Sequence, residues 1–149
     1  MKREEFSLVS FNLKDKQEVT ASYKYNGKIV KEEFTEAVHP NLYAALMAFT
    51  EVAVKQTGLD PEKKTSMVAV VETRSVHIWS GADERSIMIT VIIEWNGGYK
   101  NSINTVKMPL SVYREYTKID VEPLVEELED RAYALLIENE VGHEQAKLM

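Results

Sequence analysis

The chain has 149 residues and a formal net charge of -6, with 44% hydrophobic and 28% charged residues, an ordinary balance for one globular domain. It contains no cysteine, which excludes disulfides, thiolate metal ligands and cysteine nucleophiles and fits a reducing cytosol. No apolar run approaches the roughly 18 residues of a membrane span, and the N-terminal segment lacks the apolar core of a signal peptide. We expect a single domain over residues 1–149, in the cytoplasm.

The acidic charge is unevenly distributed along the chain. Residues 1–75 carry equal numbers of acidic and basic side chains, so the acidic excess lies in residues 76–149. An acidic surface repels phosphate backbones, and general nucleic-acid binding is therefore not expected.

The first third of the chain is typical of strands. Residues 6–13 alternate apolar and polar side chains, as a half-buried strand does. Residues 17–25 and 28–36 flank Asn26-Gly27, a dipeptide that favours a tight hairpin because both turn positions need positive φ. The three strands form an antiparallel meander, and their Lys- and Glu-rich outer positions predict one solvated face.

A helix is predicted from Pro40, since proline suits the first helical position. The apolar residues that follow recur at helical spacing: Leu42, Ala45, Leu46, Phe49, Val52 and Ala53. Gly58 stands where a C-cap glycine belongs. His39, directly before Pro40, is expected to cap or pack against the helix start.

A second group of strands follows. Residues 67–79 form a long strand whose alternation breaks at residues 72–75, and a bulge there would re-aim His77 and Trp79. Residues 80–85 form a turn. Residues 86–95 are apolar on both faces, which predicts a central strand covered on both sides. Residues 103–109 form a shorter strand that ends at Pro109.

The last element is an acidic helix with Asp120 as its N-cap. Its apolar stripe comprises Val121, Leu124, Val125, Leu128, Ala132, Leu135 and Leu136, and its acids are Glu122, Glu126, Glu127, Glu129 and Asp130. A solvated helix face explains these acids, and residues 142–149 are expected to fray. The order β-β-β-α-β-β-β-α predicts an α+β fold of antiparallel meanders with two helices, forming one sheet or two.

Motifs for catalysis or metal binding are absent from the sequence. His39, His77 and His143 do not have the spacing of a zinc motif, so no metal or cofactor is expected. There is also no nucleophile elbow, phosphate-binding loop, dinucleotide fingerprint or kinase signature. The chain is therefore predicted not to be an enzyme, with a hydrolase that uses unidentified carboxylates as the weaker alternative.

Residues 95–104, WNGGYKNSIN, contain the candidate ligand-binding loop. Gly97-Gly98 permits positive φ and can turn backbone N–H groups toward an anion. The candidate side chains are Trp95, Asn96, Tyr99, Lys100 and Asn101, of which Tyr99 could stack on a base and Lys100 could meet a phosphate. The same residue types also dominate ordinary hairpin loops, so a plain turn remains open.

Two further candidates lie near the preceding turn: Trp79 for stacking and Arg85 for bidentate phosphate binding. Residues 86–95 span about 30 Å as a strand, so this turn and the 95–104 loop lie at opposite ends of it. They could meet only across an oligomer interface. Apolar strand surface that two helices cannot cover also predicts a homo-oligomer.

The pattern His-Pro-x-Leu-x-x-Ala-Leu at residues 39–46, together with the acidic helix at residues 124–139, resembles a group of small phage and prophage proteins. This resemblance implies a phage-borne accessory protein, acting in the host cytosol. Compact phage oligomers that sequester host nucleotide signals, an anti-defence function, are similar in size and in their lack of catalytic motifs, an analogy of type that involves no particular residues. The leading hypothesis is thus a non-enzymatic homo-oligomer that binds a nucleotide-like, phosphate-bearing ligand. The alternative is an interaction module or inhibitor whose acidic helix meets a basic host protein.

Overall fold

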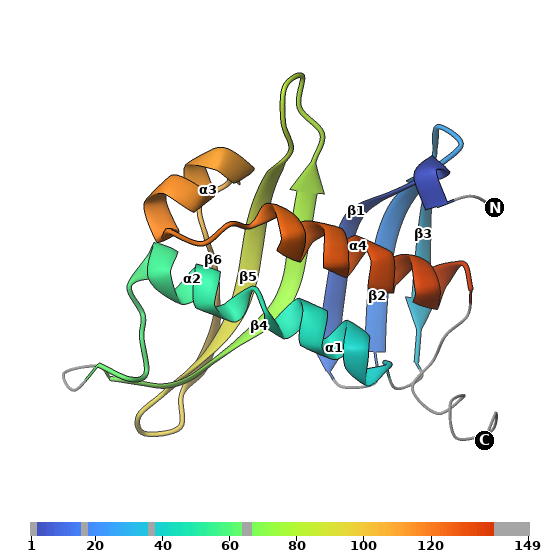
Figure 1. Ribbon diagram of the computed structural model, residues 1–149. Helices are drawn as coiled ribbons and strands as arrows, with labels where there is room; N and C mark the ends of the chain where they lie inside the picture. Colours follow the sequence, from blue (N-terminus) through green and yellow to red (C-terminus); the bar gives the residue numbers. More distant parts are fainter. Residues whose placement is uncertain (1–2, 16–17, 36–37, 64–66, 139–149) are drawn as a thin grey trace.

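The structure, a computed structural model, describes residues 3–15, 18–35, 38–63 and 67–138. An antiparallel sheet carries four α-helices (Figure 1), so the predicted α+β class is confirmed. The elements in chain order are η1 (Arg3–Glu5), β1 (Phe6–Asp15), β2 (Glu18–Tyr25), β3 (Lys28–Phe34), α1 (Pro40–Met47), α2 (Thr50–Thr57), β4 (Val68–Trp79), β5 (Ser86–Trp95), β6 (Lys100–Asn104), β7 (Met108–Pro109), α3 (Leu110–Thr117) and α4 (Glu122–Leu136). The predicted strand ends at Gln17 and Glu36, His143 and the tail 142–149 lie outside the described residues.

The two meanders form one continuous sheet with the strand order β3-β2-β1-β4-β5-β6, and β7 pairs separately with β5. They meet where β1 pairs with β4, through Ser10–His77, Phe11–Val76 and Asn12–Ser75. This junction is short, because the two strands are not paired beyond Ser75 among the described residues. The first half of β4 therefore diverges from β1.

Two local predictions in the strands are confirmed. Asn26 and Gly27 have φ of 51° and 78°, which is the conformation that a two-residue hairpin turn requires. In β4 the pairing with β5 shifts between Thr73 and Ser75, so Arg74 is the extra residue of a bulge. Because of this extra residue, Thr73 and Val76 are both buried on the helix side although they are three positions apart, and His77 and Trp79 lie on the opposite face.

The helices cover one face of the sheet. α1, α2 and α4 lie across that face in Figure 1, and α3 packs beside α2 and β7. Four alternate residues of β5 are at most 1% exposed and belong to the resulting core: Ile87, Ile89, Val91 and Ile93. No described helix covers the other face, where Met88 and Ile92 are half-buried. The expectation that this strand is covered on both sides is wrong, and we call the uncovered side the bare face.

The predicted helix from Pro40 starts correctly but is two helices, α1 and α2. His39 Nδ1 accepts a hydrogen bond from Asn41 N at 3.0 Å, which confirms its capping role. Gly58 ends α2 with φ of 76°. The chain bends at Ala48 and Phe49, whose ring is fully buried. A twisted sheet favours this bend, because one straight helix would carry its apolar stripe away from the core.

The region after β6 differs most from prediction. Pairing begins at Lys100 rather than at residue 103 and stops at Asn104, and α3 was not predicted. Thr105 explains the interruption, since its Oγ1 accepts a hydrogen bond from Ile89 N at 2.8 Å in place of a strand carbonyl. Tyr113 of α3 lies 2.6 Å from Thr105 Oγ1 and donates to Val106 O, so it fixes α3 against this break.

Helix α4 begins two residues after Asp120, which accepts a hydrogen bond from Glu122 N at 3.3 Å although the N-cap position is Val121. The expectation that all its acids lie on a solvated face is wrong for Glu129, which is only 7% exposed. Its carboxylate accepts hydrogen bonds from Arg3 at 2.9 Å, Leu8 N at 2.9 Å and Arg85 at 3.2 Å. Three donors on three segments therefore hold one buried charge.

We predict that Glu129→Ala lowers the free energy of unfolding by about 3 kcal/mol, the lower end for breaking a buried ion pair because both arginines remain partly exposed. Urea denaturation measures this. Glu127→Ala is the matched control, since the described ion pair of Glu127, with Arg131, lies on the helix surface. It should change stability by less than about 0.5 kcal/mol. Equal effects of the two substitutions would contradict a structural role for Glu129.

Candidate functional site

The candidate loop after β5 is a tight hairpin turn. Trp95 N donates to Tyr99 O at 2.7 Å, and Gly98 N donates to Trp95 O at 3.0 Å. Asn96 N donates to Met67 O at 2.7 Å. Gly97 and Gly98 have φ of 105° and 93°, as expected for glycine. Most of the N–H groups that could have cradled an anion thus bond within the protein.

The side chains of this hairpin are only partly gathered. Trp95 Nε1 donates to Asn101 Oδ1 at 2.5 Å, so these two candidates lie together. Tyr99 is 79% exposed. Lys100 lies opposite Glu94 in the β5–β6 ladder, which places a carboxylate beside the lysine. The hairpin alone is therefore a poor anion site.

The two remaining candidates lie at the far end of β5. Arg85 directs its guanidinium to the helix side, where it pairs with Glu129, so it holds the fold together. Trp79 lies on the bare face with His77 stacked on it at 4.1 Å between ring centroids. Lys107 Nζ lies 4.3 Å from the same indole centroid. The imidazole and the ammonium both occupy space against this indole, which disfavours Trp79 as the direct stacking surface for a ligand.

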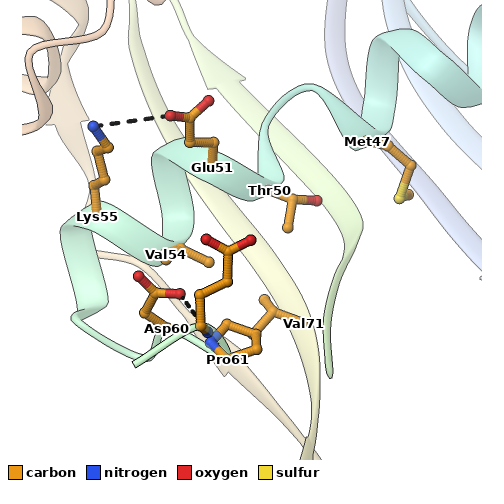
Figure 2. A pocket seen from close by; sticks show the side chains of 9 residues that line it. Met47, Thr50, Glu51, Val54, Lys55, Asp60, Pro61 and Val71 are labelled. Carbon is orange, nitrogen blue, oxygen red and sulfur yellow. Dashed lines mark hydrogen bonds and ion pairs between the residues drawn. The ribbon is translucent and has the colours of Figure 1, made fainter. Parts of the chain in front are cut away.

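A cavity of about 650 Å³ lies between α2, the segment after it and β4 (Figure 2). Its lining includes three carboxylates, Glu51, Asp60 and Glu62, and one ammonium, Lys55. Lys55 Nζ is 3.8 Å from Glu51 Oε1. Figure 2 also shows Asp60 turned back toward the following backbone, where its Oδ1 accepts from Glu62 N at 2.9 Å. The excess negative charge disfavours a phosphate ligand here.

The bare face carries a shallower groove of about 290 Å³, which we call the Arg74 groove. It is lined by Asn12, Leu13, Lys14, Arg74, Thr90, Ile92 and Ser102. The divergence of β1 from β4 leaves room for it, and the β4 bulge places Arg74 there. This lining has two cationic side chains, three small polar ones and no carboxylate, unlike the chain as a whole.

Among the described residues, the hydrogen bonds of Arg74 come from one of its terminal nitrogens. Its Nη1 donates to Lys14 O at 2.5 Å and to Leu13 O at 3.4 Å, which bridges the strands where their ladder has ended. Its Nε is buried and has no hydrogen-bond partner among the described residues. An unpaired buried N–H destabilises the folded state by roughly 1–3 kcal/mol. Nε and Nη2 form the guanidinium edge that binds carboxylate or phosphate through two parallel bonds.

Lys100 adjoins this groove through a smaller hollow of about 60 Å³, which also contacts Arg74 and Ile92. Glu72 and Glu94 line the same hollow. Of the predicted site residues, the structure therefore brings Lys100 nearest to the Arg74 groove. Sequence reasoning missed Arg74 because a single arginine inside a strand pattern has no motif, although the broken alternation at residues 72–75 marked its position.

The acids of α4 form the other candidate surface. Glu127 pairs with Arg131 at 2.8 Å, and Asp130 pairs with Arg3 at 2.8 Å. Glu129 is buried, which leaves Glu122 and Glu126 as the exposed acids of this helix without a described ion pair. The acidic face is thus less charged than its composition indicates.

Comparisons with protein-family models, curated proteins and solved structures find no match to this chain. The resemblance to phage proteins therefore stays a prediction. None of the helices in the described part of the chain has both the length and the apolar character to cross a membrane. Within the described ranges, no three His, Asp or Glu side chains are grouped to hold a metal ion.

We predict a pH dependence of stability from His77, whose pKa is lowered by burial and, second, by the Lys107 ammonium. The unfolded histidine, with a pKa near 6.5, takes up a proton at higher pH than the folded one. The stability due to neutral His77 is therefore complete above the unfolded pKa and is lost as pH falls below about 6.5.

Urea denaturation between pH 7.5 and 5.5 checks this, with His77→Phe expected to show a smaller loss than the wild type. An NMR titration of the imidazole resonances provides the second measurement. Lys107→Met should raise the pKa of His77, but not fully to its ordinary value, because burial is the larger cause. An unchanged pKa would exclude an influence of Lys107.

Proposed function

We propose that this chain is a non-enzymatic binding protein that holds a small phosphate-bearing ligand in the Arg74 groove of its bare face. The observation that carries the proposal is a cationic groove without carboxylates on an acidic chain. Arg74 keeps one edge of its guanidinium without a described partner, and the Lys14 side chain is exposed beside it. The hydroxyl of Ser102 supplies a further donor, whereas the Thr90 hydroxyl already donates to Asn104 Oδ1.

The position of the ligand follows from the charges. Glu72 and Glu94 line the neighbouring hollow, so a phosphate group is favoured at the Lys14 end of the groove and disfavoured at the Lys100 end. The non-ionic part of the ligand then extends over the rest of the bare face. Binding without turnover fits the predicted sequestering role of a phage accessory protein.

The hydrolase alternative would use Glu72 and Glu94, the carboxylates nearest the groove. A general acid at neutral pH needs an apolar site that keeps it protonated. Glu72 is exposed, and Glu94 is only half-buried with Lys100 opposite it in the ladder, so neither lies in such an apolar site. Incubation with phosphate monoesters and diesters tests the alternative, and release of inorganic phosphate in proportion to protein concentration would support it over simple binding.

The expected homo-oligomer stays a prediction, but its basis changes. The branched residues of β5 that seemed to need a partner chain face the helices. The bare face instead carries short polar side chains, charged side chains and a few exposed apolar ones such as Ile29 and Val70. Because little apolar area would be buried there, a bare-face dimer would have a polar interface.

We predict that inorganic phosphate and pyrophosphate shift backbone amide resonances of Asn12, Arg74 and Thr90 in an NMR titration. Arg74→Lys keeps the charge but removes the guanidinium edge that can form two parallel hydrogen bonds. It should weaken binding by about 10- to 100-fold, as loss of a charged hydrogen bond does. Lys14→Ala should also weaken binding and leaves the strand junction intact.

Lys24→Ala on β2 is the matched control, since Lys24 is an exposed lysine away from the groove, and its affinity should equal that of the wild type. If all three variants bind phosphate as the wild type does, or if the resonances that shift lie elsewhere, the Arg74 groove is not the site.

A further inference from the structure

A row of short polar side chains crosses the bare face beside the Arg74 groove. The strand registers align Thr20 with Asn12, Asn12 with Ser75, Ser75 with Thr90 and Thr90 with Asn104. We call these five residues the polar row. Because these five side chains are short, the row forms a low strip that runs across five strands. Asn12 and Thr90 of this row also line the Arg74 groove.

One side of the polar row is bounded by an aromatic stack. His77 is two residues beyond Ser75 on β4 and lies in the next row, between Ser10 and Met88. Its ring is nearly parallel to that of Trp79, with an interplanar angle of 19°. Because Trp79 is further along the same strand, the second face of the imidazole looks back over Ser75 and the polar row.

The opposite side of the row is bounded by Arg74 and Lys14. Arg74 is three residues before His77, about 10 Å along an extended strand. A flat ring and a phosphate group separated by a sugar span a comparable distance. The stack, the polar row and the cations thus form three successive zones along β4.

From this arrangement we propose that the ligand is a nucleoside phosphate, an inference that rests on the proposed function. The base stacks on the second face of His77 and continues the stack of His77 on Trp79. The sugar lies over Ser75, and the phosphate binds Arg74 and Lys14. Stacking on aromatic side chains is a general way for proteins to hold bases.

The amides of the polar row flank the ligand beside Ser75, where the sugar lies. Thr90 Oγ1 donates to Asn104 Oδ1 at 2.7 Å, which orients the Asn104 amide and leaves its N–H groups for an acceptor on the ligand. Asn12 lies on the other side of Ser75, so amide groups from β1 and β6 flank the ligand. The neutral form of His77, favoured by its lowered pKa, keeps the stacking surface uncharged.

The test compares three probes on the wild-type protein by calorimetry: inorganic phosphate, ribose 5-phosphate and a set of nucleoside 5′-monophosphates. We expect at least one nucleotide to bind about fivefold or more tightly than ribose 5-phosphate. His77→Ala should weaken nucleotide binding by about 5- to 150-fold, the usual effect of removing one stacking side chain. The affinity for ribose 5-phosphate should stay unchanged.

His77→Phe keeps an aromatic ring and should retain most of the nucleotide affinity, which separates stacking from loss of folding. Trp79 gives an optical readout in a Trp95→Phe background, because the chain has only 2 tryptophans. Equal binding of ribose 5-phosphate and all nucleotides, or equal nucleotide binding by the wild type and His77→Ala, would overturn this inference alone. Failure of all three probes to bind would overturn the proposed function as well.

Discussion

The buried carboxylate of Glu129 is the constraint on which the arrangement of the layers depends. Removing one carboxylate from water costs several kcal/mol unless partners replace the lost hydration. Its partners come from η1, β1 and the turn before β5, at sequence separations of 126, 121 and 44 residues. α4 can satisfy this charge only by lying across the sheet with Glu129 facing inward. That position fixes which face of the sheet the helices cover.

The chemistry of the bare face is a consequence of this one-sided layering. With apolar residues of β5 turned toward the helices, the alternate positions are free to be polar. The short β1–β4 junction has a second consequence, because the strands separate just where the β4 bulge inserts Arg74. A regular, fully paired sheet would leave no room for a groove and would point this arginine differently. The candidate site is therefore built from irregularities of the sheet.

Local signals made several features predictable. Asn26-Gly27, Pro40 and Gly58 each have a conformational preference that acts within a few residues, and each is found where that preference places it. α3 was not predicted because its apolar residues do not all lie on one face. Val112 and Tyr116 are exposed, so the sequence lacks the clear apolar stripe that indicates a helix.

The inward position of Glu129 and the role of Arg74 depend on contacts between distant segments. Nothing in the acid-rich run of α4 distinguishes Glu129 from its neighbours, because its arginine partners lie far away in sequence. The Arg74 groove could not be predicted for the same reason, because its lining residues lie far apart in the sequence. Lys100 was identified from its own loop, but Asn12 and Thr90 join the groove only through strand register, which no local pattern specifies.

The net charge of -6 does not argue against an anionic ligand, because the two faces differ in sign. The acids of α4 lie on the helix side, whereas Lys14, Arg74 and Lys107 lie on the bare face. There Glu72 and Glu94 line the hollow beside the Arg74 groove, and Glu33 lies opposite Thr20. Over distances beyond the Debye length of about 10 Å at 0.1 M salt, the acids of one face are screened from the other. An approaching phosphate therefore responds to the local cations and is repelled from the helix side. Charge segregation of this kind orients the ligand before contact, and it makes the Arg74 groove, rather than the larger acidic cavity under α2, the preferred point of entry.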